Sequence, residues 1–168
     1  MGAGKTTLLG EASDLLVARG IPHAAIDADA LDTVRLPDPT GDPDVRFRQR
    51  GVRNQNLRAI WANSAAAGVE RVLLAEAVEQ RDELDALVEA VGARRVVVCR
   101  LHAALATMQA RVRSREPGML QERFVSRVAV LDGLLDQAKL EDFTIDNDGR
   151  KVTDVATDLL VRAGWLTR

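Results

Sequence analysis

Short apolar runs alternate with segments of helical periodicity along this chain, and this alternation restricts the folds open to it. The runs occupy 23–27, 71–75, 94–101 and 143–147. Strands that form continuous apolar runs, separated by amphipathic helices, are typical of a parallel sheet covered by helices on both faces. A length of 168 residues suits one domain. The sequence therefore predicts a single three-layer α/β domain over 1–168.

Apolar spacing and terminal residues predict the helices between these runs. The first helix begins at Lys5 and ends at Gly20, a residue type common just beyond helix ends. The second spans 45–67, and the third starts with the capping residue Asp82 and ends at Gly92. The remaining helices are indicated by apolar residues that recur within 105–112, 120–135 and 155–160.

Composition favours a cytoplasmic protein that binds a small ligand. The formal net charge is −2 and aromatic residues make up 3% of the chain, so neither a basic surface nor stacking platforms for nucleic acid are indicated. Cys99 is the single cysteine, which leaves no disulfide framework within one chain. No apolar stretch approaches the ~20 residues that span a bilayer, and no signal-peptide pattern is present. We expect no nucleic-acid or membrane partner, and no feature specifies an oligomeric state.

The segment before the first helix carries the strongest functional signal. It reads GAGKTT, and its Gly-Lys-Thr is the last part of the phosphate-binding loop GxxxxGK[ST], or Walker A motif. In that motif the lysine reaches the β- and γ-phosphates, the threonine ligates Mg²⁺, and backbone N–H groups at the helix N-terminus bind phosphate oxygens. The sequence therefore predicts ATP binding, with Thr6 as the metal ligand, by Gly2, Ala3, Gly4, Lys5, Thr6 and Thr7. The alternative is a glycine-rich turn without a ligand.

The first glycine of the complete motif would lie five residues before Gly4, upstream of Met1. In proteins with this loop a buried strand leads into it. Such a strand supplies about five buried apolar side chains at roughly 1.5–3 kcal/mol each, which approaches the ~5–15 kcal/mol stability of a whole domain. We therefore expect that the first strand is missing from this chain, and that Met1 is an internal methionine of a longer natural protein.

Acidic residues follow the first apolar run in the sequence DADALD. In phosphoryl transfer a carboxylate there can orient or deprotonate the attacking hydroxyl. Asp27 and Asp29 lie on the same side of an extended backbone, and Asp32 comes one turn later. We predict that Asp29 is catalytic and that Asp27 and Asp29 bind the acceptor. The alternative is a capping or turn role, which is common for aspartate at the end of a strand.

Glu76 and a group of arginines complete the candidate site. Glu76 follows the second apolar run, where an acidic group can orient a Mg²⁺-bound water or the acceptor. Arg111 and Arg115 lie four residues apart on one helix face before Pro117, so both can face one anion. We predict that they act as catalytic groups that stabilise charge on the transferred phosphoryl group, within a lid over about 111–120. The alternatives are a solvated loop acid and a solvated basic face.

The glycine-lysine-threonine loop, the DADALD turn and an Arg- and Asn-bearing helix together resemble the adenylylsulfate kinase branch of the nucleoside monophosphate kinase-like P-loop kinases. Asp29 matches the aspartate of the GDN-type turn in that branch, and Arg53, Asn56, Leu57 and Arg58 match its Arg-x-x-Asn-aliphatic-Arg helix pattern. The segments LLAEAVE and RSREPG differ from the corresponding segments of that branch. The same group of kinases also resembles antibiotic phosphotransferases and gluconate-type kinases, which share its scaffold. The resemblance implies a P-loop NTPase fold, and acceptor binding by Arg53, Asn56 and Arg58.

These patterns together predict an ATP-dependent phosphotransferase that uses Mg²⁺ and acts on a small hydroxyl- or phosphate-bearing acceptor. A nucleotide-binding regulator or degenerate kinase without an acceptor reaction is the alternative. In a third possibility the GAGKTT segment is only a turn in a structural module. At the last apolar run, Asn147 begins an Asn-Asp-Gly sequence that can contact adenine or form a plain turn.

Overall fold

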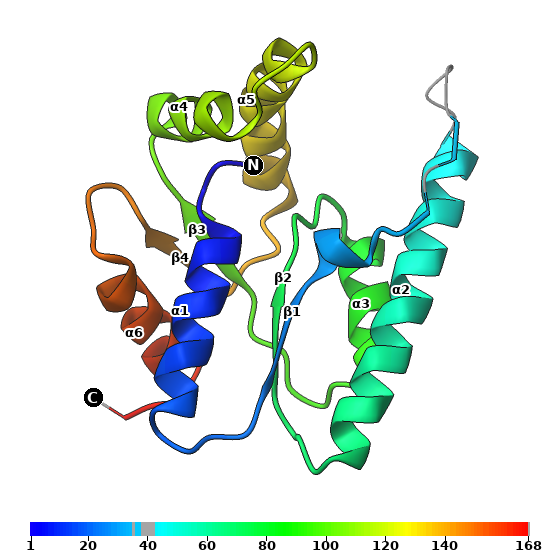
Figure 1. Ribbon diagram of the computed structural model, residues 1–168, viewed down its shortest axis with the longest axis vertical. Coiled ribbons are helices and arrows are strands. Elements are labelled where there is room, and N and C mark those ends of the chain that lie inside the picture. Colours follow the sequence, from blue (N-terminus) through cyan, green and yellow to red (C-terminus); the bar gives the residue numbers. More distant parts are fainter. Residues whose placement is uncertain (35, 38–42, 168) are drawn as a thin grey trace.

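The computed structural model describes residues 1–34, 36–37 and 43–167, and it shows an α/β protein. Helices and short strands alternate along the chain, as the sequence predicts (Figure 1). In chain order the elements are α1 (Lys5–Val17), β1 (Ala24–Asp27), the 3₁₀-helix η1 (Ala28–Leu31), α2 (Pro43–Ala66), β2 (Val72–Ala75), α3 (Arg81–Val91), β3 (Cys99–His102), α4 (Leu105–Arg115), α5 (Gln121–Ala138), β4 (Phe143–Asp146) and α6 (Val152–Arg162).

The strands form two parallel pairs. In one pair Ile26 of β1 lies opposite Leu74 of β2, and in the other Leu101 of β3 lies opposite Ile145 of β4. Parallel pairing confirms the sequence prediction. The prediction of one sheet is not met, because in the described part of the chain no ladder joins β2 to β3.

The strand predicted over 94–101 begins only at Cys99, so the prediction is wrong for 94–98. Arg94, Arg95 and Val96 are exposed rather than buried. The N–H of Val98 donates to the Asp142 carboxylate at 2.8 Å, and its carbonyl accepts from the Asp142 N–H. The apolar run therefore predicted correctly that a strand exists here, but it did not predict the residue at which the strand begins.

Helix α1 packs against both strand pairs. Its Leu8, Ala12 and Leu16 are buried in a cluster with Ile145 of β4 and with residues of α6. Leu73 of β2 and Leu101 of β3 are partly buried against the same cluster. Figure 1 shows α1 between α6 and the β1–β2 pair. One helix therefore holds the two pairs in a fixed relation.

Two smaller clusters complete the core. The first joins Ile26 of β1 to Leu57 of α2 and to Leu87 and Ala90 of α3, so the β1–β2 pair has α1 on one face and α2 with α3 on the other. The second packs Ala3 of the N-terminal turn against α4 and α5, through Ala103, Met108, Val112, Val125 and Val128. The segment predicted as a lid, 111–120, comprises the end of α4 and the link to α5. Among the described helices, none has both the length and the apolar content needed to cross a bilayer.

Substituting Leu16 tests the central role of α1. Leu16 is fully buried, so Leu16→Ala should lower the free energy of unfolding by about 2–5 kcal/mol in urea denaturation. The neighbouring Val17 is 68% exposed, so Val17→Ala should change it by no more than about 0.5 kcal/mol. Equal losses at both positions would contradict the packing of α1 on the two strand pairs.

Candidate functional site

The turn before α1 contains two glycines with positive φ angles. Gly2 and Gly4 have φ angles of 73° and 97°, values that favour glycine. A Cβ at Gly2 would lie 2.4 Å from the Met108 carbonyl oxygen, so no other residue fits without a shift. Gly4 caps α1 with no side-chain hydrogen bond, and the first turn of α1 has no acidic residue. The N–H groups at this end of α1 are therefore available to an anion.

Two side chains hold the carbonyl groups of this turn. Asn147, just after β4, donates from Nδ2 to the Ala3 carbonyl oxygen at 2.7 Å. Arg111 of α4 donates to the carbonyl oxygens of Gly2 at 3.3 Å and Ala3 at 3.5 Å. The structure thus places Arg111 behind the turn, where it fixes the backbone.

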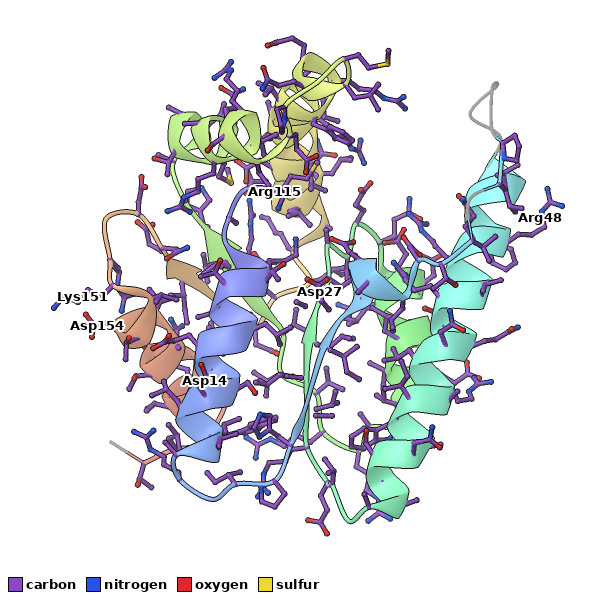
Figure 2. All side chains as sticks on the ribbon, viewed as in Figure 1. Asp14, Asp27, Arg48, Arg115, Lys151 and Asp154 are labelled. Atoms are coloured by element: carbon purple, nitrogen blue, oxygen red, sulfur yellow. The ribbon has the colours of Figure 1, made fainter. Side chains whose placement is uncertain are left out.

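Thr6 and Asp27 form the contact between α1 and β1 in this region. The Thr6 hydroxyl donates to the Asp27 carboxylate at 2.7 Å, and the other oxygen of that carboxylate accepts from the Asp29 N–H at 3.1 Å. Figure 2 shows Asp27 and Arg115 near the N-terminal end of α1. Thr6 and Asp27 together offer two oxygen ligands of the kind that Mg²⁺ uses alongside water and phosphate oxygens. Within the ranges that the structure describes, no cluster of three or more His, Cys, Asp or Glu side chains could hold a metal by itself.

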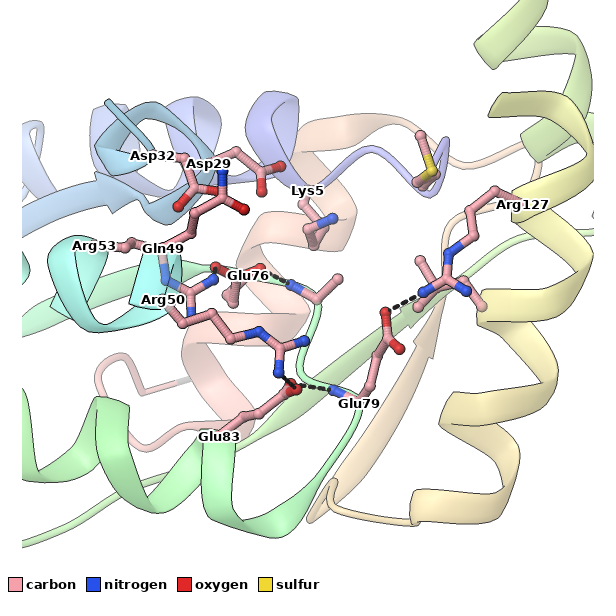
Figure 3. A pocket seen from close by; sticks show the side chains of 13 residues that line it. Lys5, Asp29, Asp32, Gln49, Arg50, Arg53, Glu76, Glu79, Glu83 and Arg127 are labelled. Carbon is pink, nitrogen blue, oxygen red and sulfur yellow. Dashed lines mark hydrogen bonds and ion pairs between the residues drawn. The ribbon is translucent and has the colours of Figure 1, made fainter. Parts of the chain in front are cut away.

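Two adjoining cavities meet at Lys5 and Asp29. The smaller, of about 120 Å³, surrounds the N-terminal end of α1 and is lined by Met1, Gly2, Gly4, Lys5, Thr6, Thr7, Asp29 and Arg115. The larger, of about 320 Å³, shares Met1, Lys5 and Asp29 with it (Figure 3). The Asp29 carboxylate has no hydrogen bond or ion pair with any residue that the structure describes. Lys5 and Asp29 therefore stand where a ligand in one cavity would meet a ligand in the other.

Three ion pairs line the larger cavity (Figure 3). Each joins a glutamate from the segment after β2 to an arginine from another element. The pairs are Arg53 with Glu76 at 2.6 Å, Arg127 with Glu79 at 2.6 Å, and Arg50 with Glu83. They connect the segment 76–83 to α2 and to α5.

Arg53 and Glu76 form the most buried of these pairs, with side chains 9% and 8% exposed. Burial raises the pKa of the Glu76 carboxyl, while the Arg53 charge and the hydrogen bond from the Ala77 N–H oppose that shift. The Nε of Arg53 is buried and has no hydrogen-bond partner in the described part of the chain. A buried donor without a partner is uncommon in folded proteins.

Other predicted residues lie elsewhere or have a different contact. Asn56 donates to the Leu31 carbonyl oxygen at 3.1 Å and lines neither cavity. Arg58 pairs with Glu89 at 3.5 Å on the surface, with its side chain 60% exposed. Arg115 lines the smaller cavity, and its Nε donates to Glu116 at 3.0 Å. Of the three acceptor positions that the helix pattern implies, only Arg53 lines a cavity.

Sequence reasoning did not identify Gln49, Arg50, Glu83 or Arg127, which also line the larger cavity. Glu83 had no local signal that relates it to Glu76 and Glu79, because residues 76–80 are not helical and α3 begins only at Arg81. Arg127 had none either, since it lies 48 residues from its partner Glu79.

Comparison with known proteins finds no relative of this sequence, because no protein-family model and no curated protein matches it.

Removing one partner of the buried ion pair should be costly. Arg53→Met would leave the Glu76 carboxylate buried without its charge partner, so we expect a loss of about 3–5 kcal/mol in the free energy of unfolding, measured in urea at neutral pH. Arg53→Met combined with Glu76→Gln should recover part of that loss. Arg58→Met is the matched control, and because its pair is exposed we expect a change within about 0.5 kcal/mol. A single Arg53→Met variant as stable as the control would contradict the buried pairing.

Proposed function

We propose that this chain is an ATP-dependent kinase that transfers the γ-phosphoryl group to a hydroxyl group of a small molecule. The observation that carries the proposal is the pair of cavities that meet at Lys5 and Asp29. One cavity surrounds a helix N-terminus and a lysine, which is a setting for phosphate groups. The other presents the Asp29 carboxylate, which has no partner among the described residues, and this is a setting for the acceptor. A transferase needs both sites in direct contact.

On the donor side the main binding groups are the N–H groups of α1 and the Lys5 ammonium. Both favour negative charge, and Arg115 adds a further cation at the rim of the same cavity. Arg111 contributes indirectly, since its hydrogen bonds to Gly2 and Ala3 hold the turn in the conformation that points these N–H groups outward. The backbone of the turn in the proposed donor site is therefore held in place by these hydrogen bonds without a ligand.

The Thr6 hydroxyl and the Asp27 carboxylate fit Mg²⁺, because they supply neighbouring oxygens and leave the remaining positions to water and phosphate. Mg²⁺, when bound, neutralises charge on the β- and γ-phosphates. Thr6 would hold the Mg²⁺ ion from α1, and Asp27 would hold it from β1.

On the acceptor side Asp29 would receive the proton. The acceptor oxygen forms a bond to the γ-phosphorus, the bond from that phosphorus to the β,γ-bridging oxygen breaks, and its electron pair leaves with ADP. The hydroxyl proton passes to the Asp29 carboxylate. Lys5, at the junction of the cavities, would stabilise the negative charge on the transferred group.

The proposal includes the P-loop NTPase fold of the nucleoside monophosphate kinase-like group and a cytoplasmic location. Support for the fold comes from the parallel strand pairs and from the glycine-lysine-threonine turn that begins α1. Both strand pairs pack on that helix.

Two substitutions test the assigned roles of Lys5 and Asp29. Lys5→Ala should weaken Mg·ATP binding in calorimetry and abolish acceptor-dependent ADP release. Asp29→Asn should leave Mg·ATP binding nearly unchanged and lower turnover by about 10²–10⁴-fold, the usual contribution of a general base. The matched controls are Lys151→Ala and Asp14→Asn, whose side chains are exposed and line neither cavity.

The outcomes separate the candidate functions. If the unsubstituted protein binds no Mg·ATP, or if Lys5→Ala retains full turnover, the kinase proposal fails. Tight Mg·ATP binding without ADP release across a panel of hydroxyl compounds would instead identify a nucleotide-binding regulator.

A further inference from the structure

The charges around the larger cavity favour one class of acceptor. Among the described residues, its lining has four basic and five acidic side chains, and the basic ones are Lys5, Arg50, Arg53 and Arg127. A cavity built to bind an acidic molecule would present basic groups in excess. This one presents a slight excess of carboxylates.

The arginines of this cavity are already occupied. Arg53, Arg127 and Arg50 each have a glutamate partner from the segment 76–83. The partner carboxylates are mostly buried, with Glu76 8% and Glu83 7% exposed in their side chains. An acidic ligand that took one of these arginines would leave a buried carboxylate without its partner, and such an arrangement is strongly unfavourable.

Under the proposed function, Lys5 is also occupied, because it binds the donor. It lines both cavities and would bind the phosphates of the donor. The Asp29 carboxylate, which has no hydrogen-bond partner among the described residues, remains available to the second ligand as a hydrogen-bond acceptor. A hydroxyl group matches it, because a hydroxyl can donate a hydrogen bond to a carboxylate.

We propose that the acceptor is a polyhydroxyl compound without acidic groups, either uncharged or amino-bearing, held in the larger cavity by hydrogen bonds to the Asp29 carboxylate. This inference rests on the proposed kinase function and narrows it, since it excludes phosphate esters and sugar acids as acceptors. An amino group is compatible with the site, because the described lining holds five carboxylates and four basic side chains.

The test compares molecules with one carbon skeleton and different charges. Glucose, glucosamine, gluconate and glucose 6-phosphate form one such set, and sets built on inositol and on glycerol extend it. Binding to the full chain with and without Mg·ATP is followed by ¹H–¹⁵N NMR at the backbone amides of Asp29, Ala77 and Glu79. ADP release is measured in the same samples.

In at least one set we expect the neutral or amino-bearing member to shift these amides and stimulate ADP release. Its acidic counterparts should bind at least about tenfold more weakly, which corresponds to a loss of about 1.4 kcal/mol in binding free energy. The inference is overturned if an acidic member binds in the cavity as tightly as its neutral counterpart. It is also overturned if no neutral or amino-bearing member of any set shifts the three amides.

A charge variant gives a second, independent readout. Glu79→Gln removes the partner of Arg127, whose side chain is 39% exposed, so this change should be tolerated by the fold. We expect it to strengthen binding of the acidic members several-fold and to leave the neutral members unchanged. Glu89→Gln, outside the cavity, is the matched control. Unchanged binding of acidic members to Glu79→Gln would show that cavity charge does not select the acceptor.

Failure of this inference can be distinguished from failure of the kinase proposal. If Mg·ATP binds and acidic compounds stimulate ADP release, the kinase function stands and the charge selection is wrong. If Mg·ATP does not bind, the kinase function fails, while the NMR comparison without nucleotide still decides which charge class the cavity accepts.

Discussion

Burial of one face of α1 is the interaction on which the rest of the structure depends. Leu8, Ala12 and Leu16 join α1 to α6 and β4, and the same cluster contacts β2 and β3. Because the helix is fixed along its length, its N-terminal end has a defined position relative to the ends of the strands. Thr6 can then reach Asp27, and Asn147 can reach the carbonyl of Ala3. The geometry of the candidate site follows from apolar packing farther along the same helix.

Electrostatic pairing shapes the second half of the site. Glutamates at positions 76, 79 and 83 hold arginines from α2 and α5, so elements far apart in the sequence form one wall. Buried ion pairs add little net stability, since desolvation offsets most of their attraction. Their effect here is to fix side-chain positions and to balance charge. Selectivity would therefore depend on the balance of these charges as well as on their positions.

Sequence patterns predicted those parts of the structure that depend on residues close together in the sequence. Apolar periodicity identified the helices and the parallel strands, and GAGKTT located the helix end that faces the cavities. Contacts between distant segments were beyond such signals. Arg127 meets Glu79 and Asn147 meets Ala3 across 48 and 144 residues, and neither pairing has a local pattern. Arg58 shows a different limit, because a helix pattern associated it with a ligand, whereas in the structure its side chain is exposed and pairs with Glu89.

The Asp27 carboxylate links Thr6 of α1 to Asp29 of η1 through its two oxygens. One accepts from the Thr6 hydroxyl, and the other accepts from the backbone N–H of Asp29 at the start of η1. A cation bound by Thr6 and Asp27 would replace the first hydrogen bond and pull on the carboxylate that holds the second. The position of Asp29 would then depend on whether the metal is present. Metal binding and acceptor binding would then be coupled, so that each would change the affinity of the other.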